Sequence, residues 1–278
     1  GVSSAASDVY KRQGLQNLTF GKYFNQPVDN LPSGLQSLTL GDEFDQPVEF
    51  KRTRSFEHPL GDRMSPTDNL PAGLQNLTFG KYFKQPVDNL PTGLQNLTFG
   101  EKFNHLVDYL PAGLQNLTLG TTFDQPVDYL PTGLKSLTFL INKYGYGFNQ
   151  PVEFKRTRSF EHPLGDRMSP TDNLPAGLQN LTFGKYFKQP VDNLPTGLQN
   201  LTFGEKFNHL VDYLPAGLQN LTLGTTFDQP VDYLPTGLKS LTFLINKYGY
   251  GFNQPVEFKR TRSFEHPLGD ILSPTDNL

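Results

Sequence analysis

The strongest constraint on this sequence is a 20-residue period that runs through most of its 278 residues. Each unit follows the pattern L-P-x-G-L-x-[NS]-L-T-[FL]-G-x-x-F-x-Q-P-V-D-[NY]. A unit of this length is too short to be a domain, and it is typical of proteins whose repeats stack on one another. The central leucine marks the regular units, at Leu18, Leu38, Leu77, Leu97, Leu117, Leu137, Leu181, Leu201, Leu221 and Leu241.

Apolar and small polar residues alternate over 96–100, which is the pattern of a half-buried strand with Leu97 and Phe99 pointing inward. The few apolar positions of one unit cannot close a core, so neighbouring units must stack at roughly 4.8 Å. The return path is too short and too rich in proline for a helix. We expect Gly93 to supply a turn with positive φ.

These features predict a mainly β fold. It is a leucine-rich-repeat-like solenoid with one short parallel strand per ~20-residue rung, an extended or turn-like return path and little helix.

A longer repeat is built from these units. Residues 46–149 recur without substitution as 150–253, and a partial third copy occupies 254–278, with Ile271-Leu272 in place of Arg167-Met168. A five-residue insertion around Leu140 to Tyr144 is expected to form a bulging loop.

One rung in each block departs from the pattern. The sequence Lys51-Arg52-Thr53-Arg54 replaces L-P-x-G in the first of them, and we interpret it as a frameshifted rung. Counted with the regular units, these rungs predict a stack of about thirteen, roughly 60 Å long. The degenerate rungs lie near 49–69, 153–173 and 257–277.

Residues 1–13 match nothing in the repeats. The run 8–13 is what a sequencing-transposon adapter encodes when it is read in frame. We therefore interpret 1–13 as a disordered, non-native segment and 14–278 as a single repeat solenoid, an internal fragment of a longer protein.

Composition and motifs argue against several functions. The chain has no cysteine, which removes disulfides and thiol chemistry and favours a cytoplasmic location. A net charge of −3 gives no field for nucleic acid, and no apolar run is long enough for a membrane span. No P-loop, H-E-x-x-H, G-x-S-x-G or Rossmann pattern occurs. We expect no enzyme activity, cofactor, metal or small-molecule substrate.

The tetrapeptides Phe24-Asn25-Gln26-Pro27 and Phe148-Asn149-Gln150-Pro151, with the L-P-x-x-L-x-x-L-x-F-G run, resemble the FNIP repeat, a relative of the leucine-rich repeat. The resemblance implies a protein-binding solenoid; some FNIP proteins also carry F-box domains, and none is visible here. The Asn or Cys that is usual in leucine-rich repeats is replaced by Tyr23, Glu43, Tyr82, Lys102 and Thr122.

Variation between rungs concentrates in the two positions that follow each strand. Mixed charges with interleaved tyrosines suit protein recognition, so we hypothesise that this variable edge and the strand face bind an unknown protein partner. A second variable column holds Asn25, Asp45, Lys84, Asn104 and Asp124. The variable edge comprises Lys22, Tyr23, Asp42, Glu43, Lys81, Tyr82, Glu101, Lys102, Lys185, Tyr186, Glu205 and Lys206.

A column of outward-facing threonines is interpreted as a hydrogen-bonded structural ladder between strands. It comprises Thr19, Thr39, Thr78, Thr98, Thr118, Thr138, Thr182, Thr202, Thr222 and Thr242. Two alternatives to a protein-binding scaffold stay open: a structural array without a specific ligand, and ice or glycan binding through the Thr and Asn columns. The aspartate before N-L-P is interpreted as a turn residue rather than a calcium ligand. His105 and His209 lie 104 residues apart, too far for one metal site.

Overall fold

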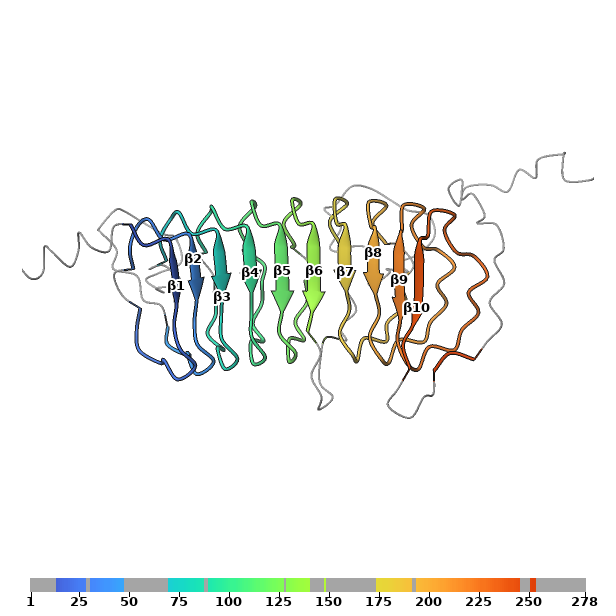
Figure 1. Ribbon diagram of the computed structural model, residues 1–278, viewed down its shortest axis with the longest axis horizontal. Helices are drawn as coiled ribbons and strands as arrows, with labels where there is room; N and C mark the ends of the chain where they lie inside the picture. The colour runs from blue at the N-terminus through green and yellow to red at the C-terminus, as the bar shows by residue number, and fades with distance from the viewer. Residues whose placement is uncertain are drawn as a thin grey trace, which may run out of the picture.

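A computed structural model describes residues 14–28, 31–47, 70–87, 90–127, 129–140, 148, 174–191, 194–245 and 251–253. These residues form one parallel sheet in which the spatial order of the strands is their order in the chain (Figure 1). The strands are β1 (Asn17–Thr19), β2 (Ser37–Thr39), β3 (Asn76–Thr78), β4 (Asn96–Thr98), β5 (Asn116–Leu119), β6 (Ser136–Phe139), β7 (Asn180–Thr182), β8 (Asn200–Thr202), β9 (Asn220–Leu223) and β10 (Ser240–Phe243).

The strands pair in the register that the 20-residue period predicts. Leu97 of β4 lies opposite Leu117 of β5, and Thr98 lies opposite Thr118. No helix occurs among the described residues. The predicted parallel solenoid of short strands is therefore confirmed.

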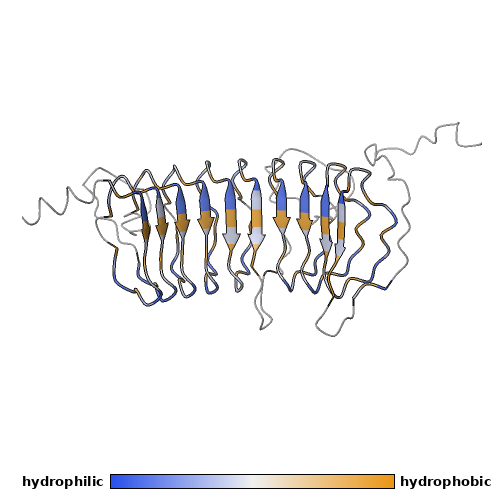
Figure 2. Cartoon of the chain, viewed as in Figure 1, coloured by the Kyte–Doolittle hydropathy of each residue, from blue (hydrophilic) through white to orange (hydrophobic). Residues whose placement is uncertain are grey.

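The alternation of residue types creates one buried and one open side of the sheet. Leu97 and Phe99 are fully buried, while Asn96 and Thr98, which alternate with them, are partly exposed. Figure 2 shows hydrophobic segments at the same place in successive strands. Each unit therefore contributes its apolar residues to continuous columns inside the coil.

Two columns of phenylalanine fill the end of the core that lies beyond the strands. Phe99 at the strand end stacks on Phe103 of the same rung with ring centroids 3.8 Å apart. Phe103 then stacks on Phe123 of the next rung at 6.3 Å. Stacking runs both within and between rungs, so the columns tie each unit to its neighbours.

A tight turn precedes the strand in each rung. In the rung of β4, the N–H of Leu94 donates to the carbonyl of Pro91 over 3.1 Å. The positive φ predicted for Gly93 is wrong, because its φ lies outside the left-handed region. The central residues of this turn reverse the chain without that conformation. A side chain at Gly93 would lie 3.3 Å from the carbonyl oxygen of Ala72, so close packing limits this position instead.

The glycine that follows β2, β3, β4, β5, β8 and β9 meets the backbone of the rung before it. A Cβ built on Gly100 would lie 2.0 Å from the carbonyl oxygen of Gly80, and one on Gly120 would lie 1.7 Å from that of Gly100. These distances exclude any side chain. Glycine is therefore required here by close approach of two backbones, not by its backbone angles.

Two neighbouring pairs of strands are separated by more than one period in the chain. β2 pairs directly with β3, and β6 pairs directly with β7. We call these two places the seams. The degenerate rungs near 49–69, 153–173 and 257–277 lie outside the described residues, as do residues 1–13, so the thirteen-rung stack stays a prediction.

The five-residue insertion leaves the core columns intact. Phe139 and Phe148 are nine positions apart in the sequence, yet their rings stack at 4.1 Å as those of Phe99 and Phe103 do. Phe148 continues the column that contains Phe103 and Phe123. Its ring centroid lies 6.2 Å from those of Phe123 and Phe187. The loop predicted around Leu140 to Tyr144 lies mostly outside the described residues.

Candidate binding surface

The variable edge is a row of stacked β-turns. The N–H of Phe123 donates to the carbonyl of Gly120 over 3.2 Å, so the two variable residues are the central residues of the turn. Successive turns are joined through the backbone, because the N–H of Lys102 donates to the carbonyl of Lys81 over 2.9 Å. Backbone hydrogen bonds of this kind do not depend on the side chains, so the side chains of this edge can differ between rungs.

Three turns of the variable edge carry a Lys-Tyr pair. The ammonium of Lys22 lies 5.2 Å from the centre of the Tyr23 ring, and Lys81 and Tyr82 repeat this geometry at 5.2 Å. The third pair, Lys185 and Tyr186, is at 5.5 Å. A cation over an aromatic face is attracted by the ring quadrupole. Tyr23 is nevertheless 78% exposed and Tyr82 38% exposed, so both rings face solvent.

Ion pairs connect neighbouring turns of the same edge. Glu205 lies 2.8 Å from the ammonium of Lys185 in the preceding rung and 3.3 Å from that of Lys206 in its own. The hydrogen bond from Lys185 lowers the pKa of Glu205, and the same bond raises the pKa of Lys185. Glu101 likewise raises the pKa of Lys81, from 3.2 Å. These ion pairs contribute little to stability because the side chains are solvated.

The structure brings the predicted edge residues together in two groups. Residues 22–102 supply the first group and residues 185–206 the second, with a seam between them. The acidic turn Asp42-Glu43 fits between the first two Lys-Tyr turns: the N–H of Glu43 donates to Lys22, and the N–H of Tyr82 donates to Asp42. The edge thus changes sign between each of its first three turns.

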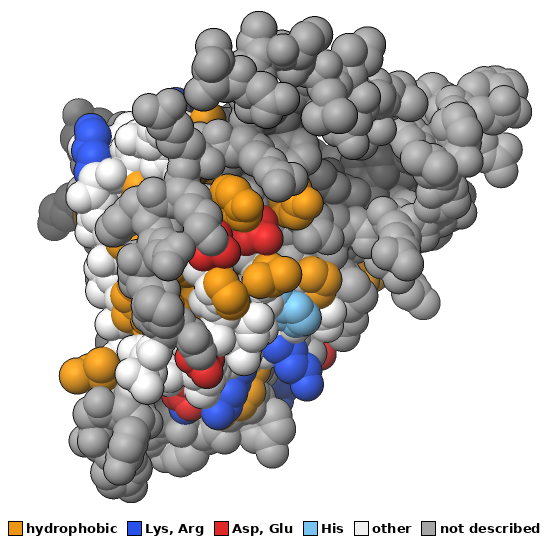
Figure 3. Space-filling view, turned by 90° about the vertical axis from the view of Figure 1, so that its right-hand side faces the viewer, with side chains coloured by type: hydrophobic (Ala, Val, Ile, Leu, Met, Phe, Trp, Pro, Cys, Tyr) orange, Lys and Arg blue, Asp and Glu red, His pale blue; other side chains and the backbone are white. Residues whose placement is uncertain are grey.

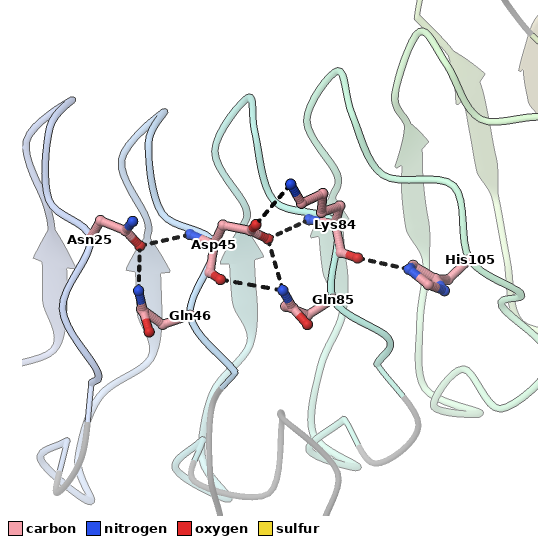
Figure 4. Close-up of polar contacts among 6 residues, drawn as sticks. All are labelled: Asn25, Asp45, Gln46, Lys84, Gln85 and His105. Atoms are coloured by element: carbon pink, nitrogen blue, oxygen red, sulfur yellow. Dashed lines mark hydrogen bonds and ion pairs between the residues drawn. The ribbon is translucent and has the colours of Figure 1, made fainter.

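The second variable column forms a hydrogen-bonded ladder. The side-chain oxygen of Asn25 accepts from the N–H of Asp45 and from the amide of Gln46, each over 3.0 Å (Figure 4). Asp45 repeats this one rung further on, accepting from Lys84 and Gln85 over 3.0 and 3.1 Å. The F-x-Q-P motif is thereby explained, because its x residue accepts and its Gln donates. This role was missed in the sequence, where the column's variation suggested recognition.

Histidine replaces the Gln of this ladder where the preceding rung has a lysine in place of Asn or Asp. Lys84 offers no side-chain acceptor, and the next rung carries His105, whose Nε2 lies 2.7 Å from the Lys84 carbonyl oxygen (Figure 4). His209 makes the same contact with the carbonyl of Lys188 at 2.7 Å. In each case the form protonated on Nε2 donates to the carbonyl.

On the strand face, asparagines join side chain to side chain. The amide nitrogen of Asn96 donates to Asn76 and that of Asn116 donates to Asn96, both over 2.6 Å. Asn180, Asn200 and Asn220 repeat the chain at 2.5 Å. The structure thus shows a side-chain ladder of asparagines in the neighbouring column, which the sequence analysis did not single out, and the threonine ladder stays a prediction.

A second exposed surface lies on the return path. Leu106 replaces the usual proline and is 55% exposed, and Tyr109 nearby is 77% exposed. Burial, with a smaller effect of Asp232, raises the pKa of Asp212 in the same region. In the end-on view of Figure 3, hydrophobic side chains gather beside acidic side chains and a His side chain. We call this the return edge; its exposed apolar residues are Leu106, Tyr109, Tyr129, Leu210 and Tyr213.

The part of the chain that the structure describes contains no group of three or more His, Cys, Asp or Glu residues able to hold a metal ion. Within the same part, no helix is long and apolar enough to cross a membrane.

The sequence matches a family model described as FNIP Repeat over residues 24–51, 66–102 and 170–206. The second and third matches cover the same repeats in the two identical blocks. No curated protein matches the sequence.

The fold is similar to the crystal structure of CroV588, described as a novel circular LRR protein structure. The TM-score is 0.55 at 28% sequence identity, and the likeness covers 84% of this chain. The chain spans only 38% of the length of that protein. The family match and the stacked parallel strands agree with the F-x-Q-P ladder described above, and the chain therefore carries FNIP repeats folded as a leucine-rich-repeat-like parallel β-solenoid.

Proposed function

We propose that this solenoid is a non-enzymatic scaffold that binds a protein partner across the variable edge. The observation that carries the proposal is the backbone hydrogen bonding between successive turns, such as that from Lys102 to Lys81. These hydrogen bonds form whichever side chains the turns carry. Those side chains then differ in charge and shape from rung to rung, which suits recognition of one particular surface.

The Lys-Tyr turns are the expected anchors of such an interface. Tyrosine gives a large contact area at little cost in conformational entropy and is enriched among residues that dominate binding. Lys22 and Lys81 lie against the tyrosine rings and orient them while leaving them exposed. The charged turns between these anchors supply electrostatic selectivity.

The protonation of this edge supports a binding role rather than catalysis. A lysine that acts as a nucleophile or base needs a lowered pKa. The pKa values of Lys81 and Lys185 are raised by the neighbouring carboxylates of Glu101 and Glu205.

Capture of partners from an extract of the source cells tests the proposal. The edge variant replaces Tyr23, Tyr82 and Tyr186 with Ala, and the matched control replaces Tyr109, Tyr129 and Tyr213 on the return edge. Circular dichroism checks that both variants fold. Quantitative mass spectrometry then compares the captured proteins with those on the unchanged chain.

We expect one protein to be captured equally by the unchanged chain and by the control. The edge variant should capture at least about tenfold less of it, which corresponds to a loss of about 1.4 kcal/mol in binding free energy. Equal capture by the edge variant would exclude the variable edge as the binding surface. A structural array without a ligand would enrich no protein over an unrelated solenoid on the same resin.

A further inference from the structure

The same surface occurs twice on the variable edge. The turns Lys81-Tyr82 and Glu101-Lys102 form the first copy, and they recur 104 residues later as Lys185-Tyr186 and Glu205-Lys206, the second copy. The N–H of Lys206 donates to the carbonyl of Lys185 over 2.8 Å, as that of Lys102 does to Lys81 over 2.9 Å. The carboxylate of Glu205 lies 3.3 Å from the ammonium of Lys206, and that of Glu101 lies 3.5 Å from the ammonium of Lys102. The two copies are therefore alike in conformation as well as in sequence.

The two copies belong to one continuous sheet. The seam between them is a full rung contact, in which β6 pairs with β7. The rings of Phe139 and Phe183 stack across it at 6.2 Å with their planes 1° apart. The N–H groups of Gln179 and Asn180 donate across it to the carbonyl of Lys135 over 2.9 and 3.0 Å. The sheet therefore holds the two copies at a constant spacing (Figure 1).

Four steps from strand to strand separate the copies, because the first follows β3 and β4 and the second follows β7 and β8. Neighbouring strands lie about 4.8 Å apart, so equivalent residues of the two copies are roughly 19 Å apart. A compact domain of about 100 residues has a radius of gyration of about 13 Å, so it is wider than this spacing. Two such domains, each bound to one copy, would therefore overlap.

Charge and shape indicate what each copy would recognise. Each copy has two lysines and one glutamate, an excess of one positive charge. The carboxylate of Glu101 lies 3.2 Å from the ammonium of Lys81 and 3.5 Å from that of Lys102, so a single negative charge faces two positive ones. The Tyr82 ring beside them is exposed. A cationic site next to an aromatic face suits an acidic side chain that adjoins an apolar one.

We propose, on the basis of the function proposed above, that one protein partner binds both copies at once. The partner carries the same acidic element twice, at a spacing of roughly 19 Å that matches the four-strand repeat of the sheet. Once the first element is bound, the second binds intramolecularly, so the affinity rises through effective concentration without any new kind of contact. A partner with a repeat of its own is therefore the kind of protein that this edge fits.

The chain offers a matched pair of deletions that tests the spacing. Residues 110–129 and 214–233 are the same 20-residue unit, and each contains one strand, β5 or β9. Removing 110–129 keeps the period and both copies but reduces their separation to three strand steps. Removing 214–233 takes away the same sequence and leaves the separation at four. Both deletions are made in the full chain, and circular dichroism checks that the variants fold.

The probe is the protein captured in the experiment above, purified and titrated onto each chain by isothermal titration calorimetry. We expect one partner molecule per unchanged chain. Removing 110–129 should weaken binding at least about tenfold, because a mismatched span loses most of the gain from effective concentration. Removing 214–233 should change the affinity less than about twofold, because the span is kept.

The tyrosine of the second copy gives an independent check. Tyr186→Ala should weaken binding at least about tenfold in the unchanged chain and in the 214–233 deletion. In the 110–129 deletion the same substitution should cost at most about twofold, because only one copy is then engaged at a time.

Two partner molecules bound per chain, or equal affinities of the two deletion variants, would overturn simultaneous binding of both copies while leaving the variable edge as the binding surface. A chain that captures no protein in the earlier experiment would instead contradict the proposed function, and this interface with it.

Discussion

Gly80 and Gly184 occupy the same place in two identical blocks, yet they meet different neighbours. A Cβ on Gly80 would lie 1.8 Å from the carbonyl oxygen of Gly41. One on Gly184 would lie 3.4 Å from that of Leu140, an ordinary van der Waals contact, because the preceding rung carries Leu140 and not a glycine at this place. Local sequence is the same at both sites, so any difference between them reports the stacking alone.

Replacing Gly80 with Ala is therefore expected to destabilise the protein, and replacing Gly184 with Ala is not. The new methyl group at position 80 forces two backbones apart, which we expect to cost about 1–3 kcal/mol as overpacking does. The Gly184 variant should stay within about 0.5 kcal/mol of the unchanged protein. Urea unfolding followed by circular dichroism measures both. Equal losses in the two variants would mean that backbone flexibility, and not contact with the preceding rung, requires glycine here.

The side chains that face the core and the register between rungs were predictable from the sequence, whereas the close backbone approaches and the side-chain ladder between rungs were not. Leu97 and Phe99 were recognised because alternation along one strand defines a buried side. The constraint on Gly100 arises from the rung before it, which a pattern within one unit does not reveal. Asn25 and Asp45 were placed in a recognition column because they vary, but Asn and Asp share the side-chain oxygen that the ladder uses.

At the scale of the rung, the two turns and the strand form a unit that tolerates long interruptions in the chain. Leu38 and Leu77 are 39 residues apart and still lie side by side. Removing residues 51–69 would take out 19 residues and restore the period of 20, since 39 − 19 = 20. The period alone could not show that Ser37 would pair directly with Asn76, because the two residues are separated by nearly two periods in the chain.

Excision of the second degenerate segment is expected to leave the fold unchanged. Joining Phe154 to Leu174 gives the sequence P-V-E-F-L-P, close to the regular P-V-D-Y-L-P at 126–131. Because β6 already pairs with β7, no strand contact is lost, and the shorter connection lowers the entropy cost of closing the loop. Thermal unfolding by circular dichroism should give a midpoint equal to or above that of the unchanged chain. A lower midpoint would show that residues 155–173 stabilise the solenoid.

Across the whole molecule, every contact between strands joins consecutive members of the sheet. The stability of such an array is approximately a sum of rung terms and nearest-neighbour terms. The two ends and the seams therefore differ from the interior only locally, and a complete block contributes as a module.

Removal of residues 150–253 should give a folded protein of 174 residues, since 278 − 104 = 174. It would keep β1 to β6 and lose four of the ten strands, so the dependence of unfolding free energy on urea should fall by about two-fifths. The same deletion removes Lys185, Tyr186, Glu205 and Lys206. A partner that spans both groups of the variable edge would then bind more weakly, whereas a spacer would lose nothing.

The position of the block boundary has a consequence for recombination between copies of the repeat. Blocks begin at Gln46, Gln150 and Gln254, always at the same point of the return path. A recombination event between two such points therefore adds or removes a whole number of rungs, and the rung left beside the junction has the same sequence as the one it replaces. Such an exchange would lengthen or shorten the sheet by four strands for each block while the contacts inside every rung stay the same.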